Sequence, residues 1–248
     1  MNEPIAVIVI PCYNEYGRLA IEKFVNFAQE HGNIRFIFVD DGSTDGTEEL
    51  IKPYCGARIQ LHTLTRNSGK AEAVRQGILR ALEQEPSRIG FWDADLSTPL
   101  RTICSFHETM EQNRNLDMVI GFRVCRLGAD IKRNAGRHII GRILMTVLYS
   151  LLDFTVYDSQ CGAKMMTAEA ARAITGEPFH TRWLFDLEML VRLQRFRRTD
   201  LHAEVYEYPL EEWHEIGRSK VRIGAVMKDV IRFFRYYKGE KKHNGFFR

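Results

Sequence analysis

Two aspartates, Asp93 and Asp95, flank a single alanine in the segment Asp93-Ala94-Asp95. In an extended segment, residues i and i+2 project to the same side, so both carboxylates can face one point. Carboxylate oxygens suit Mg²⁺ or Mn²⁺, and Mg²⁺ usually takes one or two of them and completes its shell with water and substrate phosphates. An acidic surface loop is the simpler alternative. The segment follows a short apolar run, as the other polar clusters of the chain do, and this position favours a divalent-cation site.

A second acidic pair, Asp40 and Asp41, opens the turn DDGSTDG at 40–46. A turn followed by a helix cap explains Ser43, Asp45 and Gly46, because these residue types are favoured in both roles. It does not explain two adjacent carboxylates, whose mutual repulsion destabilises the fold unless a ligand donates hydrogen bonds to them. The pair therefore indicates a ligand site.

Basic residues accompany both acidic clusters. Lys70 precedes a predicted helix, and helix N-termini favour phosphate. Six further cations fall within twenty positions: Arg123, Arg126, Lys132, Arg133, Arg137 and Arg142. A charge run is commonly a solvated face, but this one directly follows a predicted strand beside the presumed metal, which favours phosphate binding.

The elements that must position these residues alternate along the chain. Short runs rich in Val, Ile and Phe predict strands at 5–10, 34–39, 59–64, 89–92 and 118–122, the first ended by Pro11. Helical patterns occupy 18–29, 45–54 and 71–83, and a further helix follows Pro99. This alternation predicts an α/β fold with a mostly parallel mixed sheet flanked by helices. Ligands of such sheets bind outside the carboxyl ends of the strands, where the polar clusters stand.

Composition sets the broad class of the protein. The 248 residues are 45% hydrophobic and 27% charged, which is ordinary for a globular protein and excludes collagen, low-complexity disorder and a disulfide-stapled miniprotein. Five scattered cysteines without CxxC spacing favour a reducing compartment.

The start of the chain lacks signal-peptide features, and no apolar run reaches about 18 residues. We expect a cytoplasmic protein that can lie on a membrane without crossing it. Dinucleotide, P-loop and nucleic-acid-binding motifs are absent, so no nucleic acid partner is expected.

Charge is distributed unevenly along the chain. Residues 218–248 contain ten Lys or Arg against two acids, whereas the whole chain has a net charge of only +3. We therefore divide the chain into a catalytic domain at 1–217 and a basic amphipathic segment at 218–248. Helical periodicity within 138–154 and 221–238 gives apolar faces that predict either core packing or interfacial helices. Basic residues beside such a face predict contact with an anionic membrane surface.

Seven stretches together resemble the inverting GT-A glycosyltransferases of family 2. In chain order they are PCYNE (11–15), VDDGSTDGT (39–47), RNSGKAEAVRQG (66–77), DADLSTP (93–99), DSQCGAK (158–164), RWLFDLEML (182–190) and EWHEIGRSK (212–220). The last three are typical of the dolichyl-phosphate glucosyltransferases and dolichyl-phosphate mannose synthases. The resemblance implies a GT-A fold and transfer of a hexose from a nucleotide-diphospho-sugar.

The resemblance also implies roles for matching residues. The predicted nucleotide-sugar site consists of ten residues from these stretches: Pro11, Tyr13, Glu15, Asp40, Asp41, Lys70, Asp93, Ala94, Asp95 and Lys220. Asp93 and Asp95 would bind the metal, and the acceptor phosphate would meet Arg123, Arg133 and Arg137. Asp186, Gln160 and Arg123 are the predicted catalytic residues, with Glu188 bordering the sugar. Ser97 replaces a Gln that often helps bind metal in mannose synthases, and Arg137 stands roughly where they have a serine, so the second metal ligand and the sugar stay open.

The nature of the acceptor decides which catalytic groups are needed. A hydroxyl acceptor requires a general base, for which Asp186 is the candidate. A phosphomonoester has a second pKa of about 6, so at neutral pH it needs cations rather than a base. The cations at 123–142 therefore favour a polyprenyl or dolichyl phosphate acceptor. The resemblance to the glucosyltransferase branch implies UDP-glucose as the first candidate donor and GDP-mannose as the second. The alternatives are a family 2 enzyme acting on a saccharide or lipid hydroxyl, a non-catalytic GT-A-like binding module, and a sugar-nucleotide pyrophosphorylase. Clustered carboxylates argue against the binding module, and PCYNE is unlike a pyrophosphorylase loop.

Overall fold

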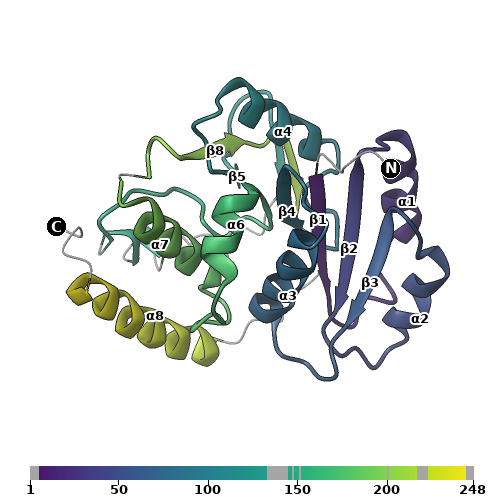
Figure 1. Ribbon diagram of the computed structural model, residues 1–248, viewed down its shortest axis with the longest axis horizontal. Coiled ribbons are helices and arrows are strands. Elements are labelled where there is room, and N and C mark those ends of the chain that lie inside the picture. Colours follow the sequence, from purple (N-terminus) through teal and green to yellow (C-terminus); the bar gives the residue numbers. More distant parts are fainter. Residues whose placement is uncertain are drawn as a thin grey trace.

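A mixed seven-stranded sheet forms the centre of the molecule, and helices pack against it (Figure 1). The computed structural model describes residues 6–132, 145–146, 148–150, 152–199, 201–216 and 223–243. The sheet has the order β3-β2-β1-β4-β7-β5-β8. Its strands are β1 (Ala6–Cys12), β2 (Ile34–Asp40), β3 (Ile59–Thr63), β4 (Arg88–Trp92), β5 (Met118–Phe122), β7 (Ala163–Thr167) and β8 (Val205–Pro209). Only β7 runs antiparallel to its neighbours, β4 and β5. A two-stranded sheet pairs β6 (Asp130–Lys132) with β9 (Glu212–His214).

The helices are α1 (Ile21–Glu30), α2 (Thr47–Ile51), α3 (Lys70–Leu82), α4 (Thr102–Gln112), α6 (Ala168–Thr175), α7 (Phe185–Arg197) and α8 (Ile223–His243), with a short 3₁₀ helix at Lys52–Tyr54. From β1 to β5 they alternate with the strands, as the sequence predicts, whereas α6 and α7 follow one another between β7 and β8 and were not predicted. The predicted α/β class with a mostly parallel mixed sheet is confirmed.

Helices α1 and α3 cover opposite faces of the sheet. The ring of Phe24 in α1 packs edge-on to Phe36 and Phe38 of β2, with ring centroids 5.4 and 5.2 Å apart. Gly77 of α3 lies so close to Val39 that a Cβ would come within 2.8 Å of its side chain. Phe36 and Phe38 alternate with Val39 along β2, so the two helices contact opposite sides. Close approach at Gly77 fixes α3, and hence Lys70 at its start, against the sheet.

Strand β1 extends two residues further than predicted. Pro11 lies inside the strand rather than ending it, because pairing with β4 stops at Val9 while pairing with β2 continues to Cys12. Proline lacks an N–H, and a position where the ladder on one side has ended can accommodate it.

Helix α7 is buried on all sides. Every residue from Phe185 to Gln194 is buried, including Asp186, Glu188 and Arg192. A helix without a solvent face shows no apolar stripe in the sequence, and its buried polar groups need partners inside the protein. These partners form much of the site described below.

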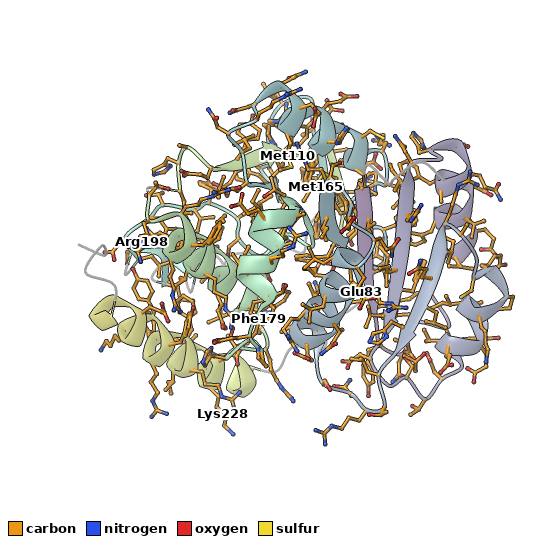
Figure 2. The ribbon with its side chains drawn as sticks, viewed as in Figure 1. Glu83, Met110, Met165, Phe179, Arg198 and Lys228 are labelled. Carbon is orange, nitrogen blue, oxygen red and sulfur yellow. The ribbon has the colours of Figure 1, made fainter. Side chains whose placement is uncertain are left out.

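Helix α8 confirms the helical periodicity predicted at 221–238. Its inner side buries Val226, Asp229, Phe233 and Tyr237. On its outer side, Met227 and Ile231 are about half exposed, at 49% and 51%. Among the residues of this helix whose side chains the structure describes, the exposed basic ones are Lys228, Arg232, Arg235 and Lys238. The side chain of Lys228 points away from the body of the protein (Figure 2).

The other segment with an amphipathic pattern, 138–154, lies largely outside the described residues. Within its described part, Met145, Leu148 and Phe154 are buried. Across the described ranges, none of the helices combines the length and the apolar character needed to span a bilayer.

Candidate active site

The predicted polar clusters meet at one edge of the sheet. Strands β2, β1 and β4 are parallel neighbours, and Cys12 at the end of β1 pairs with Asp40 at the end of β2. Asp93 directly follows β4 on the same edge. The structure therefore brings the segments 11–15, 40–46 and 93–95 together, as the parallel arrangement predicts.

Side-chain hydrogen bonds join the loops that follow β1 and β2. The Ser43 hydroxyl accepts the Asn14 N–H at 2.9 Å, and the Asn14 carbonyl oxygen accepts the Thr44 N–H at 2.9 Å. Asn14 adopts a positive φ of 52°, a conformation that asparagine tolerates better than most residues. Asp40 is 1% exposed and accepts the Ser43 N–H at 3.2 Å and the Ser43 hydroxyl. Asp40 thus holds the second loop, which in turn positions the first.

Glu15 and Arg18 link this region to the acidic pair after β4. Glu15 is buried and its carboxylate binds the Arg18 guanidinium through two hydrogen bonds. Glu15 raises the pKa of Arg18, and the negative charges of Asp95 and Asp93 raise it further. Sequence reasoning missed Arg18, although its spacing of three residues from Glu15 is typical of a local ion pair. Tyr13, also predicted to bind the nucleotide, is 37% exposed at the same edge.

Asp41 positions the loop before α3. Its two carboxylate oxygens accept the N–H groups of Ser68 at 2.6 Å and Gly69 at 2.7 Å. Burial raises the pKa of Asp41, and these two hydrogen bonds oppose the rise. The hydrogen-bond donors that we expected from a ligand come from the protein itself, for Asp41 as for Asp40.

Asp93, Asp95 and Lys70 form the charged centre of this edge. The Lys70 ammonium pairs with the Asp93 carboxylate and lies 5.8 Å from the centroid of the Phe91 ring. The Lys70 side chain is 40% exposed, so its partial desolvation lowers its pKa less than the negative charges of Asp93, Asp186 and Asp95 raise it. Burial raises the pKa of Asp95, and the negative charge of Asp93 adds to the rise.

The residues at this centre fit a divalent cation. The mutual repulsion of Asp93 and Asp95 is the unfavourable interaction that a bound cation relieves, and hard oxygen donors suit Mg²⁺ or Mn²⁺. Across the described ranges, no three His, Cys, Asp or Glu side chains form a group that could hold a metal ion. A cation at Asp93 and Asp95 would thus take its remaining ligands from water and from substrate oxygens.

A buried ion pair lies beneath this centre. Lys164 of β7 is fully buried, and its ammonium binds the Asp186 carboxylate and donates to the Cys161 carbonyl oxygen at 2.7 Å. The Lys164 ammonium also lies 5.1 Å from the centroid of the Phe91 ring. Burial raises the pKa of Asp186, although the positive charges of Lys164 and Lys70 lower it. Lys164 was missed as a site residue because a lysine inside a strand of the core is rare.

Arg123 has partners within the protein. Its guanidinium forms a bidentate pair with Asp158, at 2.8 and 2.7 Å, and lies 5.1 Å from the centroid of the Trp213 ring. The Asp158 charge raises the pKa of Arg123 above its ordinary value in spite of burial. Gln160 lies two residues beyond Asp158, and its amide donates to the Ser159 hydroxyl at 3.4 Å. Asp158 and Trp213 stand in stretches that carry the resemblance, but neither residue type nor spacing indicates that they pair with Arg123.

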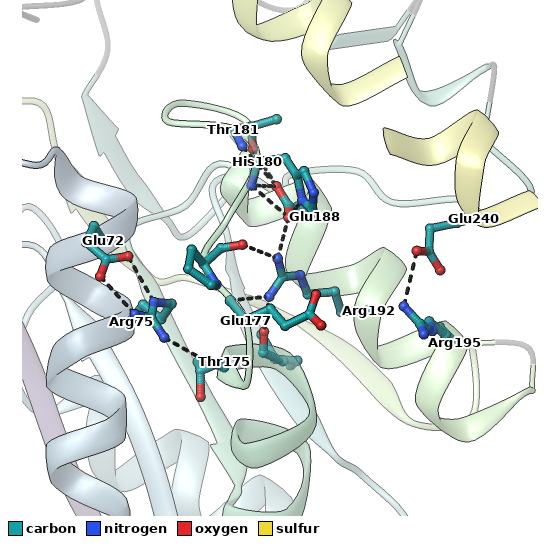
Figure 3. Close-up of polar contacts among 12 residues, drawn as sticks. Glu72, Arg75, Thr175, Glu177, His180, Thr181, Glu188, Arg192, Arg195 and Glu240 are labelled. Atoms are coloured by element: carbon teal, nitrogen blue, oxygen red, sulfur yellow. Dashed lines mark hydrogen bonds and ion pairs between the residues drawn. The ribbon is translucent and has the colours of Figure 1, made fainter. Parts of the chain in front are cut away.

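Glu188 binds the loop before α7 rather than projecting into open space (Figure 3). Its fully buried carboxylate accepts the N–H groups of His180 at 3.0 Å and Thr181 at 3.1 Å, and pairs with Arg192 at 2.7 Å. The prediction that Glu188 borders the sugar assigned it a direct role, whereas these contacts give it a role in holding the loop at 180–181.

A pocket of about 520 Å³ opens between this loop and the loop held by Asp41. It is lined by Arg66, Asn67, Ser68, Ala71, Glu72, Phe179, Thr181 and Arg182. Residues of the predicted nucleotide-sugar site do not line it, but Lys70 is next to Ala71 in the chain. Buried carboxylates, Asp41 on one side and Glu188 on the other, therefore fix both walls of a pocket beside the charged centre.

Three predicted site residues, Arg133, Arg137 and Lys220, lie outside the described residues. Their assigned contacts with phosphate and nucleotide stay predictions. Pro11 is half-buried and Ala94 is buried at the same edge as Asp93.

Known proteins resemble this chain in sequence and in structure. A family model described as glycosyl transferase family 2 matches residues 7–175. The dolichyl-phosphate beta-glucosyltransferase ALG5C of Trichomonas vaginalis is 31% identical, over 93% of this chain and 70% of its own length. The dolichyl-phosphate beta-glucosyltransferase of Dictyostelium discoideum is 30% identical, over 94% of this chain and 75% of its own length.

Among solved structures, glucosyl-3-phosphoglycerate synthase from Mycobacterium tuberculosis has a similar fold. Its complex with Mn²⁺, UDP-glucose and phosphoglyceric acid gives a TM-score of 0.69 at 18% identity, over 94% of this chain and 79% of that chain. This likeness confirms the predicted GT-A fold.

Gly162 gives a direct test of the charged centre. A Cβ at Gly162 would come within 1.8 Å of an Asp93 carboxylate oxygen, so alanine there must displace that carboxylate. We expect Gly162→Ala to weaken Mn²⁺ binding in the presence of UDP by about tenfold or more, the effect typical of disturbing a group that orients metal ligands. Isothermal titration calorimetry measures it.

The matched control is Gly176→Ala, where a Cβ meets no atom closer than 3.5 Å. This variant should bind Mn²⁺ and UDP as the wild type does. Equal affinities for all three proteins would show that Asp93 does not contribute to a metal site.

Proposed function

Because the chain belongs to glycosyl transferase family 2, we propose that it transfers glucose from UDP-glucose to a polyprenyl or dolichyl phosphate. The observation that carries the proposal is the convergence of Asp93, Asp95 and Lys70 at the carboxyl edge of the sheet. Two carboxylates for a cation, and a lysine paired with one of them, suit a nucleoside diphosphate. The names of the two relatives support glucose and dolichyl phosphate as the transferred sugar and the acceptor.

In this proposal the edge of the sheet binds the donor. Pro11, Tyr13, Glu15 and Asp40 contact the nucleoside, and Lys70 pairs with the diphosphate once the donor is bound. Asp93 and Asp95 hold Mg²⁺ or Mn²⁺, which supplies positive charge that stabilises the departing diphosphate. The solved relative with Mn²⁺ and UDP-glucose supports this choice of ion and donor. GDP-mannose is the second candidate donor.

The reaction is a displacement at the anomeric carbon. An acceptor phosphate oxygen forms the new bond to that carbon as the bond to the diphosphate oxygen breaks, and the electron pair leaves with the nucleoside diphosphate. No proton needs to be removed from a phosphate that is already ionised. A reaction without a general base agrees with the state of the Asp186 carboxylate, which is buried and paired with Lys164. Arg123, held by Asp158, and Arg133 and Arg137 provide the positive charge that the acceptor requires.

A hydroxyl acceptor is the second candidate. The observation in its favour is the position of the Asp186 carboxylate, which lies in the buried ion pair with Lys164 beneath the charged centre. Burial there raises its pKa, which suits a general base. Asp186 would then take the proton of the acceptor hydroxyl, and the pairing with Lys164 would have to open.

We also propose that the protein binds the cytoplasmic face of a membrane through α8. Its outer side combines half-exposed Met227 and Ile231 with four exposed cations. Apolar side chains flanked by basic residues are typical of helices that lie in a bilayer interface. A polyprenyl acceptor is held in the bilayer, so the enzyme must reach it there.

A panel of labelled nucleotide-sugars tests the proposed reaction. We expect UDP-glucose, incubated with the protein, Mg²⁺ or Mn²⁺ and dolichyl phosphate, to transfer label into the organic phase, and EDTA to abolish the transfer. Dolichol, which has a hydroxyl in place of the phosphate, is the matched acceptor control. Label on dolichol but not on dolichyl phosphate would contradict the phosphate acceptor, and transfer from GDP-mannose alone would contradict the donor.

Asp186→Asn separates the two candidate acceptors. With a phosphate acceptor we expect turnover to fall less than about tenfold, whereas loss of a general base costs about 10²–10⁴-fold. Donor affinity and thermal unfolding are measured on the same samples. The single change leaves the buried Lys164 unpaired, so Lys164→Met with Asp186→Asn serves as a second variant without the isolated charge. Loss of activity in both, with donor binding intact, would favour the hydroxyl route.

Sedimentation with anionic liposomes tests the membrane proposal. We expect the wild type to pellet at low salt, because each basic residue near an anionic surface contributes about 1 kcal/mol. Changing the four exposed cations of α8 (Lys228, Arg232, Arg235 and Lys238) to Glu should leave the protein in the supernatant. The charge-matched control changes four exposed cations elsewhere: Lys23, Lys52, Arg58 and Arg114. Equal pelleting of both variants would show that α8 is not the membrane-binding surface.

A further inference from the structure

The helix that carries Asp186 has no cap of its own. Helix α7 starts at Phe185, and its N-cap residue is Leu184, whose side chain makes no capping hydrogen bond. Leu184 is fully buried in the core, so the position cannot hold the Ser, Thr, Asp or Asn that usually caps a helix. The N–H groups at this end still require acceptors.

Asp229 of α8 supplies the missing acceptor. One oxygen of its carboxylate accepts the N–H groups of Arg182 at 2.8 Å and Leu184 at 3.2 Å, and also that of Trp183. Asp229 is 2% exposed and lies 45 residues further along the chain than Leu184. A carboxylate at a helix N-terminus is also favoured by the helix dipole. Asp229 therefore accepts the N–H of the N-cap residue Leu184 and those of the two residues before it, and in this sense it caps α7 from another helix.

The first turn of α7 contains Asp186, two residues beyond Leu184. The Leu184 carbonyl oxygen accepts the first N–H groups of the helix, those of Leu187 at 3.0 Å and Glu188 at 3.1 Å. Fixing the backbone at 182–184 thus fixes this turn and the direction in which Asp186 leaves the helix. Asp186 in turn contacts Lys164 at the charged centre.

A separate contact holds α8 to the protein elsewhere. The Tyr237 hydroxyl accepts the Asp153 N–H at 2.9 Å and donates to the Asp153 carboxylate at 2.8 Å. This contact lies two turns further along α8 than Asp229 and does not involve α7. It allows docking of α8 to be distinguished from capping of α7.

We propose that Asp229 is a positioning residue for the catalytic centre. By capping α7 it holds Asp186 in place, and it makes the site depend on the docked position of the basic helix α8. The part of the proposal that concerns turnover rests on the proposed function, whereas the capping does not.

Amide hydrogen exchange and turnover of the full chain test this role. In Asp229→Asn we expect exchange at Leu187 and Glu188 to become about tenfold faster, the size of effect that loss of a cap produces. Glucose transfer should slow by less than about tenfold, no more than in Asp186→Asn. The affinity for UDP should stay unchanged, because the carboxylate of Asp229 contacts the N–H groups at 182–184 and not the loops that follow β1 and β2. Tyr237→Phe, the matched control, removes a docking contact of α8 but keeps the Asp229 carboxylate, so it should affect exchange at these two amides and turnover less than Asp229→Asn does.

The following outcomes would each contradict the proposal. Unchanged exchange at Leu187 and Glu188 would show that Asp229 does not hold the first turn. Faster exchange with full turnover would reduce Asp229 to a structural role, and an equal effect of Tyr237→Phe would attribute the change to docking in general. If Asp229→Asn does not fold, Asp229→Glu keeps the charge and should show a smaller effect in the same direction. A wild type without transferase activity would refute the proposed function, and exchange would still decide whether Asp229 caps α7.

Discussion

The concentration of carboxylates near one edge of the sheet is the constraint on which the rest of the structure depends. A buried carboxylate destabilises a fold unless hydrogen bonds or a cation compensate it. For the buried pair, the compensating groups are Ser43 for Asp40 and the N–H groups of the loop at 68–69 for Asp41. Asp93 is partly exposed and pairs with Lys70 at the start of α3. The contacts that satisfy the acids are therefore the same contacts that shape the loops, and folding and formation of the site are one process.

The buried charges of helix α7 fix the positions of neighbouring groups rather than add to the stability of the fold. Asp186 pairs with Lys164 and Glu188 with Arg192, all in the core. Replacing a buried ion pair by well-packed apolar residues is often neutral or stabilising by about 1–4 kcal/mol. Two buried ion pairs therefore contribute less to the stability of this helix than apolar packing would. Their directional hydrogen bonds instead fix the loop at 180–181 and the carboxylate of Asp186, which nonpolar packing would leave less defined.

Local patterns in the sequence predict the parts of the fold that local interactions determine. Strands β1, β2 and β4 follow from their apolar runs, and the meeting of Asp40 and Asp93 follows from the parallel arrangement. Strand β7 was not predicted, because Lys164 interrupts its short apolar run, and α7 shows no apolar stripe because all its sides are buried. The partners of Asp41 lie 27 and 28 residues away and those of Asp229 more than 40. Such pairings depend on tertiary structure, which residue type and spacing do not reveal.

The position of α8 connects the proposed membrane-binding surface with the helix that carries Asp186. One side of this helix presents cations and apolar side chains to the surroundings, and the other side presents Asp229 to the start of α7. A rigid helix cannot shift on one side without shifting on the other, so a surface that binds its outer side also acts on the cap. In the proposed function the enzyme takes its donor from water and its acceptor from a bilayer. The proposed contact of α8 with the bilayer, together with its contact to the start of α7, would then tie the geometry of the catalytic centre to the place where the acceptor is found.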